Sequence, residues 1–167
     1  MLLLNINIFR NWNYEKNYIK WIRSKVGHEK IFLNFVGGCI KNDKGDILLQ
    51  RRSDKNKWGF PGGAMEIGES AKEATLREIK EETGLDVEIE NLIGIYTDYY
   101  DEYPNGDYAQ TISIFFELKV IGGCIDDTDS ETLELKYFNI NDFPKLVNKQ
   151  HNDVYHDIKN KVYGVIR

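Results

Sequence analysis

The chain has 167 residues, a length that suits one domain of ordinary size with its own hydrophobic core. Its 22 Lys and Arg residues against 27 Asp and Glu residues give a net charge of −5. This balance argues against a general nucleic-acid-binding protein, which needs a basic face to neutralise phosphates. A hydrophobic fraction of 41% with 13% aromatic residues argues against a disordered chain.

The sequence shows no membrane span, no signal peptide and no cysteine motif. No apolar run approaches the ~20 residues of a membrane span, and Met1 to Asn7 has neither a basic region nor a cleavage site of the signal-peptide type. The two cysteines, Cys39 and Cys124, form neither a disulfide framework nor a zinc motif. We therefore expect a reduced, cytoplasmic protein with no membrane partner.

The N-terminal part predicts a strand followed by a helix. Apolar and polar residues alternate from Leu4 to Ile8, which is the period of a strand. Asn13 is the expected cap of the helix and Gly27 its end. The helix carries an apolar stripe of Tyr14, Tyr18, Trp21, Ile22 and Val26. We predict that residues 1–30 form an accessory segment on a domain of residues 31–167, or contribute to a homodimer contact.

The domain itself mixes strands and helices without strict alternation. Strands are predicted over residues 31–41, 46–51, 85–98, 108–120 and 133–138. Helices are predicted over residues 70–83, 141–146 and 150–162. This order favours a mixed sheet sandwiched between helices.

The first of these helices has clear signals at both ends. Ser70 followed by Glu73 is the pattern of a capping box at the N-terminus. Gly84 stands where a helix end favours a residue that tolerates positive φ. These signals define the helix independently of its tertiary contacts.

Three carboxylates project from one face of this helix. Glu78, Glu81 and Glu82 are spaced three and four residues apart, and like charges at that spacing destabilise a helix by ~0.2–0.5 kcal/mol per pair. They also lie near the C-terminal end, where the helix dipole disfavours anions. A bound divalent cation such as Mg²⁺ or Mn²⁺ would remove this penalty. An ordinary solvated, Glu-rich helix is the alternative interpretation.

The loop before the helix favours the interpretation as a site. Gly62 and Gly63 allow the backbone to approach a ligand closely, and their carbonyl groups are suitable metal ligands. Glu69 and Arg77 are spaced so that an ion pair would fix the loop against the helix. Loop, cap and acidic face together predict a functional site.

The segment from Gly63 to Leu85 resembles the signature of the Nudix hydrolases, a family that includes MutT-like enzymes and ADP-ribose pyrophosphatases. That signature reads Gly, five residues, Glu, seven residues, then Arg-Glu-apolar-any-Glu-Glu-any-Gly-apolar. It is matched without departure at Gly63, Glu69, Arg77, Glu78, Ile79, Glu81, Glu82, Gly84 and Leu85.

The resemblance implies a fold and an activity. The fold is an α/β/α sandwich around a mixed β-sheet. The reaction is the attack of water on a nucleoside diphosphate linked to a group X, giving a nucleoside monophosphate and phosphorylated X. The expected partner is therefore a small nucleotide-derived diphosphate, not a nucleic acid.

The resemblance also assigns roles to residues. Glu78 and Glu82 would be the main ligands of Mg²⁺ or Mn²⁺, with the Gly63 carbonyl completing the shell. Glu81 would be a third ligand or the base for the attacking water. Arg77 and Glu69 would orient these groups.

A base outside the signature is a further expectation from the family. Glu131 and Glu134 are the candidates, beside an acidic run at residues 126–129. A solvated acidic loop is the alternative interpretation of each residue.

Substrate contacts are predicted in two places. Arg51 and Arg52 end a strand just before the Gly-rich loop, where a guanidinium group suits a phosphate. Tyr100 and Tyr103 lie in a Tyr-rich stretch, and Trp58 precedes the loop; each ring could stack on a base or sugar. Surface pairing and core packing are the respective alternatives.

The sequence leaves the substrate open among ADP-ribose, dinucleoside polyphosphates and modified (d)NTPs. A non-catalytic nucleotide sensor of the same fold is an alternative function. An enzyme similar to isopentenyl diphosphate isomerase is another, with Cys39 as its thiol. The three histidines lack metal-ligand spacing and receive no role.

Overall fold

A computed structural model describes residues 17–103, 105–126, 128 and 130–167. The helices are α1 (Tyr18–Val26), α2 (Ala71–Thr83) and α3 (Lys149–Lys159). The strands are β1 (Ile31–Ile40), β2 (Ile47–Arg52), β3 (Trp58–Gly59), β4 (Leu85–Glu102), β5 (Tyr108–Gly123), β6 (Thr132–Phe138) and β7 (Val165–Ile166).

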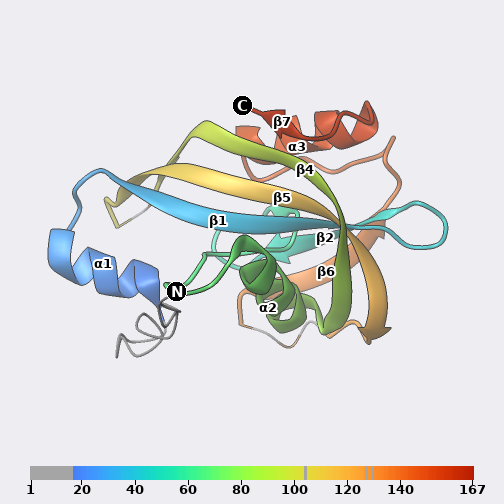
Figure 1. The fold of residues 1–167 in the computed structure, drawn as a ribbon, viewed down its shortest axis with the longest axis horizontal. Helices are drawn as coiled ribbons and strands as arrows, with labels where there is room; N and C mark the ends of the chain where they lie inside the picture. The colour runs from blue at the N-terminus through green and yellow to red at the C-terminus, as the bar shows by residue number, and fades with distance from the viewer. Residues whose placement is uncertain (1–16, 104, 127, 129) are drawn as a thin grey trace, which may run out of the picture.

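The strands form two sheets. The larger sheet has the order β1-β5-β4-β7, in which β5 is parallel to β1 and antiparallel to β4, and β7 is parallel to β4. The smaller sheet is antiparallel, in the order β3-β2-β6. Helices α2 and α3 lie on opposite sides of the long strands β1, β5 and β4 (Figure 1). The prediction of a mixed sheet flanked by helices is therefore confirmed, with a second sheet added to it.

Each of these two helices contributes to its own hydrophobic core. Ile79 of α2 belongs to one cluster of buried side chains, with Leu48 and Leu118. Val154 and Ile158 of α3 belong to the other. The two cores hold the helices in place and so fix the side chains that α2 presents on its other face.

Both end signals of α2 act as predicted. Ser70 and Glu73 form the complete capping box, and Gly84 adopts a left-handed conformation with φ 73°. Since these signals are local, the helix begins and ends where the sequence places it.

Other predictions need correction. Residues 141–146 are not helical: Asn139 and Asp142 form a turn, and Leu146 makes a β-bridge with Trp58. Pro144 explains the error, because the residue before a proline is disfavoured in the helical region. Strands β4 and β5 are longer than predicted, since they pair with each other along most of their length.

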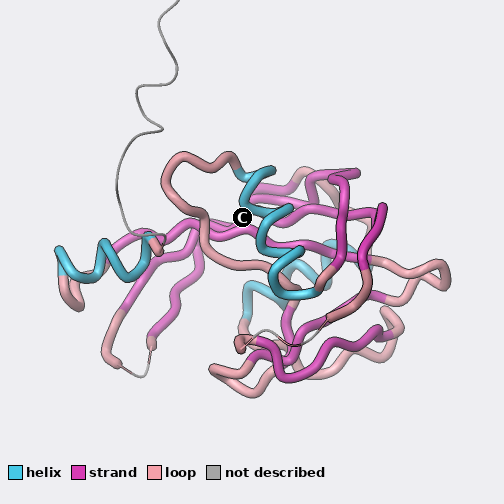
Figure 2. The backbone as a smooth tube through the Cα atoms, turned by 90° about the horizontal axis from the view of Figure 1, so that it is seen from below, coloured by secondary structure: helices cyan, strands magenta, loops and turns pink. Residues whose placement is uncertain are grey.

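The N-terminal helix begins later than predicted. Its cap is Asn17, not Asn13, and Gly27 ends it as expected. Asn13, Tyr14 and the strand predicted over residues 4–8 lie outside the described residues. Figure 2 shows α1 at one end of the molecule, and its Arg23 side chain donates to the Tyr108 carbonyl at the start of β5. The homodimer contact stays a prediction.

Among the described residues, no helix combines the length and the apolar character that a membrane crossing requires.

Candidate active site

The Gly-rich loop closes over the outer edge of β1. Val36 N–H donates to the Gly63 carbonyl at 2.9 Å, and Gly38 N–H donates to the Pro61 carbonyl at 3.0 Å. Gly62 adopts φ 144°, and a Cβ atom there would overlap the Val36 carbonyl. Glycine is therefore required at this position for the loop to reach the strand.

Arg77 connects the loop to the acidic face of α2. Its Nε and Nη2 atoms donate to the two carboxylate oxygens of Glu69 at 2.6 and 2.8 Å, which confirms the predicted ion pair. Its Nη1 atom donates to Glu78 at 2.7 Å and to Glu81 at 3.0 Å. The Ala64 carbonyl accepts a further bond from Nη2 at 3.1 Å. One guanidinium group thus sets the positions of three carboxylates and the loop backbone.

Glu82 is the most buried carboxylate of α2, with 4% of its surface exposed. Gly62 N–H donates to its Oε2 atom at 2.6 Å. Burial raises the pKa of Glu82 to about 8, although hydrogen bonding to Gln50, the bond from Gly62 and the charge of Arg52 act in the opposite direction. Burial also raises the pKa of Glu78. Both carboxylates thus lie where a negative charge is poorly compensated.

A cavity of about 300 Å³ brings together three carboxylates of α2 and three of the residues predicted outside the signature. Its described lining contains Glu78, Glu81, Glu82, Glu131, Arg52 and Tyr103, with Asn17, Ile19, Phe35, Ala64 and Glu66. Gly63 lies directly beside it, because a Cβ atom there would overlap the Glu78 carboxylate. Carboxylates from α2 and from the segment before β6 therefore share one space with an arginine and a tyrosine.

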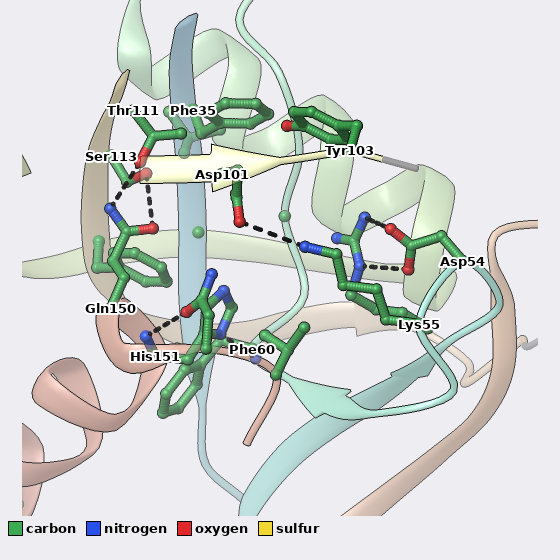
Figure 3. Close-up of a pocket in the computed structure, with 17 residues that line it drawn as sticks. Phe35, Asp54, Lys55, Phe60, Asp101, Tyr103, Thr111, Ser113, Gln150 and His151 are labelled. Atoms are coloured by element: carbon green, nitrogen blue, oxygen red, sulfur yellow. Dashed lines mark hydrogen bonds and ion pairs between the residues drawn. The ribbon is translucent and has the colours of Figure 1, made fainter. Parts of the chain in front are cut away.

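A second cavity, of about 80 Å³, shares Phe35, Arg52 and Tyr103 with the first. Figure 3 shows Gln150 reaching toward Thr111 and Ser113, and Lys55 reaching toward Asp101. The two cavities share Phe35, Arg52 and Tyr103, so these side chains stand between the carboxylates of α2 and the second cavity.

Among the predicted substrate contacts and the candidate bases outside the signature, four residues lie outside both cavities. Arg51 and Glu134 pair with each other across the smaller sheet at 3.2 Å. Trp58 packs edge-on against Phe138. Tyr100 is 54% exposed, and its ring lies near that of Tyr108. The structure therefore separates Arg52 from Arg51, Tyr103 from Tyr100, and Glu131 from Glu134.

His151 is a cavity residue that the sequence does not reveal. The Phe60 N–H donates to its Nδ1 atom at 3.1 Å, and burial lowers the pKa of the ring to about 3. The imidazole is therefore neutral and carries its proton on Nε2. His151 and the buried Gln150 beside it both lie on α3, far from the signature in the sequence. No motif therefore connects them with the site.

The donor set suits a hard divalent cation. The described residues contain no group of three or more His, Cys, Asp or Glu side chains already arranged around one point. Glu78, Glu81 and Glu82 nevertheless line one cavity, and the half-buried Glu78 and the buried Glu82 both have raised pKa values. Oxygen ligands of this kind fit Mg²⁺ or Mn²⁺, and a cation would supply the charge that the site lacks.

Known proteins resemble the chain in sequence and in fold. The family model described as NUDIX domain matches residues 34–158. An ADP-ribose pyrophosphatase of Methanocaldococcus jannaschii is 36% identical over 146 residues, covering 84% of this chain and 82% of that protein. A MutT-like protein of Streptomyces ambofaciens is 29% identical over 120 residues, covering 72% of this chain and 70% of that protein.

A solved structure gives the same result for the fold. The MutT protein from Methanosarcina mazei Go1 superimposes with a TM-score of 0.67 at 26% identity, covering 80% of this chain and 96% of that one. The matched family model spans the cavity carboxylates and Arg77. The chain therefore belongs to the NUDIX domain family and is a Nudix hydrolase.

Proposed function

We propose that the protein hydrolyses the diphosphate linkage of a nucleoside diphosphate joined to a group X, releasing a nucleoside monophosphate and phosphorylated X. The observation that carries the proposal is the shared cavity of Glu78, Glu81 and Glu82 with Arg52 and Tyr103. An anionic diphosphate would be repelled by these carboxylates alone, so the proposal includes a divalent cation.

The proposed ion is Mg²⁺, with Mn²⁺ as a substitute, held by Glu78, Glu81, Glu82 and the Gly63 carbonyl. The carbonyl accepts one bond from Val36 N–H and retains a second lone pair for a metal. When bound, such an ion neutralises diphosphate oxygens and lowers the pKa of a coordinated water.

Arg77 and Glu69 act on the carboxylates and not on the substrate. The bidentate pair holds Arg77, and Arg77 in turn holds Glu78 and Glu81 by its Nη1 atom. We assign both residues as positioning residues for the carboxylates.

Two residues are candidates for the base that takes the proton of the attacking water. Glu81 and Glu131 both line the cavity, and Glu81 is the more exposed member of the α2 face. Glu134 is held by Arg51 outside the cavity. The proposal therefore favours Glu81 or Glu131 over Glu134.

Arg52 and Tyr103 are the proposed substrate contacts. Two bonds of 3.1 Å to Asp54 fix the guanidinium group of Arg52, which lines both cavities. A guanidinium group in this position suits a phosphate oxygen, and the Tyr103 ring offers a face for a base or sugar.

ADP-ribose is the first substrate to test, because the M. jannaschii relative is named an ADP-ribose pyrophosphatase. Dinucleoside polyphosphates and modified (d)NTPs are the alternatives. An isomerase that uses Cys39 is disfavoured, since this thiol is fully buried and burial raises its pKa to about 12. A nucleotide sensor would bind the same ligands without turnover.

The test is ³¹P NMR analysis of the products formed with Mg²⁺ from ADP-ribose, diadenosine tetraphosphate and dGTP. Cleavage of ADP-ribose to AMP and ribose 5-phosphate is the expected result. Binding of a panel member without cleavage of any, in folded protein, would favour the sensor and overturn the proposed hydrolysis.

A further inference from the structure

Helix α1 lies outside the residues that the family model matches, yet it reaches the candidate active site. Asn17, its cap, and Ile19, in its first turn, line the cavity that contains the α2 carboxylates. No described residue of α1 is buried in the core. The helix thus contributes to a cavity wall and not to the hydrophobic core.

Hydrogen bonds fix the start of α1 to the loop that precedes α2. Tyr18 N–H donates to the Glu66 carboxylate at 2.9 Å. Glu66 N–H in turn donates to Glu69 at 3.0 Å, and Glu69 holds Arg77. A continuous series of bonds therefore runs from α1 through the loop to the carboxylates of α2.

Arg23 fixes the other end of α1. Its Nη2 atom donates to the Tyr108 carbonyl at 2.9 Å, and its Nη1 atom donates to the Glu29 carbonyl at 2.7 Å. Its Nε atom lies 3.5 Å from Asp107, and only 10% of the side chain is exposed. Anchored at both ends, α1 holds Asn17 and Ile19 in fixed positions.

The wall that α1 provides differs in chemistry from the rest of the cavity. The charged groups of the lining, several carboxylates and the cation of Arg52, all come from the rest of the chain, which also supplies the uncharged Phe35, Ala64 and Tyr103. Asn17 and Ile19 add an amide and an aliphatic side chain. The Oδ1 atom of Asn17 caps the helix by accepting from Lys20 N–H at 2.9 Å. The amide nitrogen is the group of Asn17 that can donate to a ligand hydroxyl. A neutral, hydroxyl-bearing ring fits this wall, whose described residues offer no cation to a phosphate.

We infer that α1 is a substrate-binding wall, on which Asn17 and Ile19 contact a neutral ribose-like ring attached to the diphosphate. The inference deepens the proposed function and rests on it. The ring can belong to the nucleoside or to the group X, and Arg23 is the positioning residue that keeps the wall in place.

The test compares Ile19→Ala and Asn17→Ser with the wild type, using ADP-ribose and dGTP as substrates. Serine keeps the helix cap but removes the amide donor. Ile22→Ala is the matched control, because it makes the same change on the same helix outside the cavity lining. We expect each cavity variant to raise KM for ADP-ribose by about five-fold with kcat within two-fold, and the control to leave both unchanged.

The two substrates distinguish the two ends of the ligand. A higher KM for ADP-ribose alone places the X group on α1, whereas an equal rise for dGTP places the nucleoside there. Arg23→Met should raise KM in the same pattern without lowering kcat, which a general loss of folding would not do.

Calorimetric titration with the same two ligands repeats the comparison without turnover, so a failure of hydrolysis is distinguishable from a failure of this inference. Unchanged KM and Kd in Ile19→Ala and Asn17→Ser would overturn the inference. The inference would also be overturned if the wild type bound neither ADP-ribose nor dGTP.

Discussion

Two buried carboxylates of this protein have opposite environments. Asp157 of α3 is 2% exposed, accepts two bonds from Arg167 at 2.6 and 2.9 Å, and accepts a third from the Tyr96 hydroxyl at 2.8 Å. These partners lower its pKa in spite of burial. Glu82 of α2 is nearly as buried, has no comparable ion pair, and has its pKa raised to about 8.

Under the proposed function, the difference separates a structural carboxylate from a metal-binding one. At Asp157 the protein supplies the compensating charge itself, and the result joins α3, β4 and the residue after β7. At Glu82 the compensation is incomplete, and the pKa of the neighbouring Glu78 is also raised by burial although Glu78 is paired with Arg77. An incompletely compensated carboxylate facing a cavity is suited to bind a cation from outside.

The largest expected effect is on catalysis. Glu82→Gln keeps the shape of the side chain but removes the ligand charge, and kcat should fall by about 10²–10³-fold. Glu90→Gln is the matched control, because this exposed residue of β4 lies outside both cavities. Steady-state rates with ADP-ribose and Mg²⁺ give the comparison. Equal rates in the two variants would contradict the assignment of Glu82.

Asp157→Asn should instead damage stability and spare the chemistry. The amide keeps only one of the two acceptor oxygens and cannot form an ion pair with Arg167, so the free energy of unfolding should fall by about 3 kcal/mol. Asp142→Asn, at an exposed turn position, should change it by less than about 0.5 kcal/mol. Urea denaturation measures both values. A fall in kcat larger than the fall in folded fraction would mean that Asp157 is not merely structural.

In protein kept free of metal by EDTA, Glu82→Gln should raise the free energy of unfolding, whereas Asp157→Asn lowers it. Because burial penalises the charge at this position, the neutral isostere should raise the free energy of unfolding by about 1–2 kcal/mol. Urea denaturation beside the Glu90→Gln control measures the difference. A destabilised Glu82→Gln protein would show that the charge is already well compensated.

The smallest expected effect is the pH dependence of the Asp157 contribution. Its folded pKa lies below the unfolded value, so its stabilisation is fully present above pH ~4 and is lost as pH falls through the folded pKa. The stability difference between wild type and Asp157→Asn should therefore stay constant from about pH 5 to 7 and shrink in more acid solution. A difference that grows on acidification would contradict the lowered pKa.

The helix that carries the carboxylates could be predicted because its signals are local. The cap at Ser70, the end at Gly84 and the spacing of the glutamates all lie within one short segment. The Glu69–Arg77 pair follows from the same spacing. These features do not depend on how distant strands pair.

The choice between neighbouring candidates depends on tertiary structure. Arg51 faces Glu134 across the smaller sheet, and a register shift follows between Arg51 and Arg52, where Arg52 pairs with Thr132. Successive side chains of a strand point to opposite faces, so only one of the two arginines reaches the cavity. Sequence spacing does not determine that register.

The uncharged residues that line the two cavities could not be predicted from the sequence either. His151 and Gln150 come from α3, and Asn17 and Ile19 come from α1, each far from the signature in the chain. Their positions result from the packing of α1, α3 and the signature segment around the two cavities.

The most direct test of the contrast between the two carboxylates is Mn²⁺ binding measured by electron paramagnetic resonance, which reports free and bound ion without turnover. Wild type and Asp157→Asn are predicted to bind Mn²⁺ with the same affinity, and Glu82→Gln to bind it at least about ten-fold more weakly. Equal affinity in wild type and Glu82→Gln would show that the incompletely compensated carboxylate of α2 is not a metal ligand, which contradicts the account.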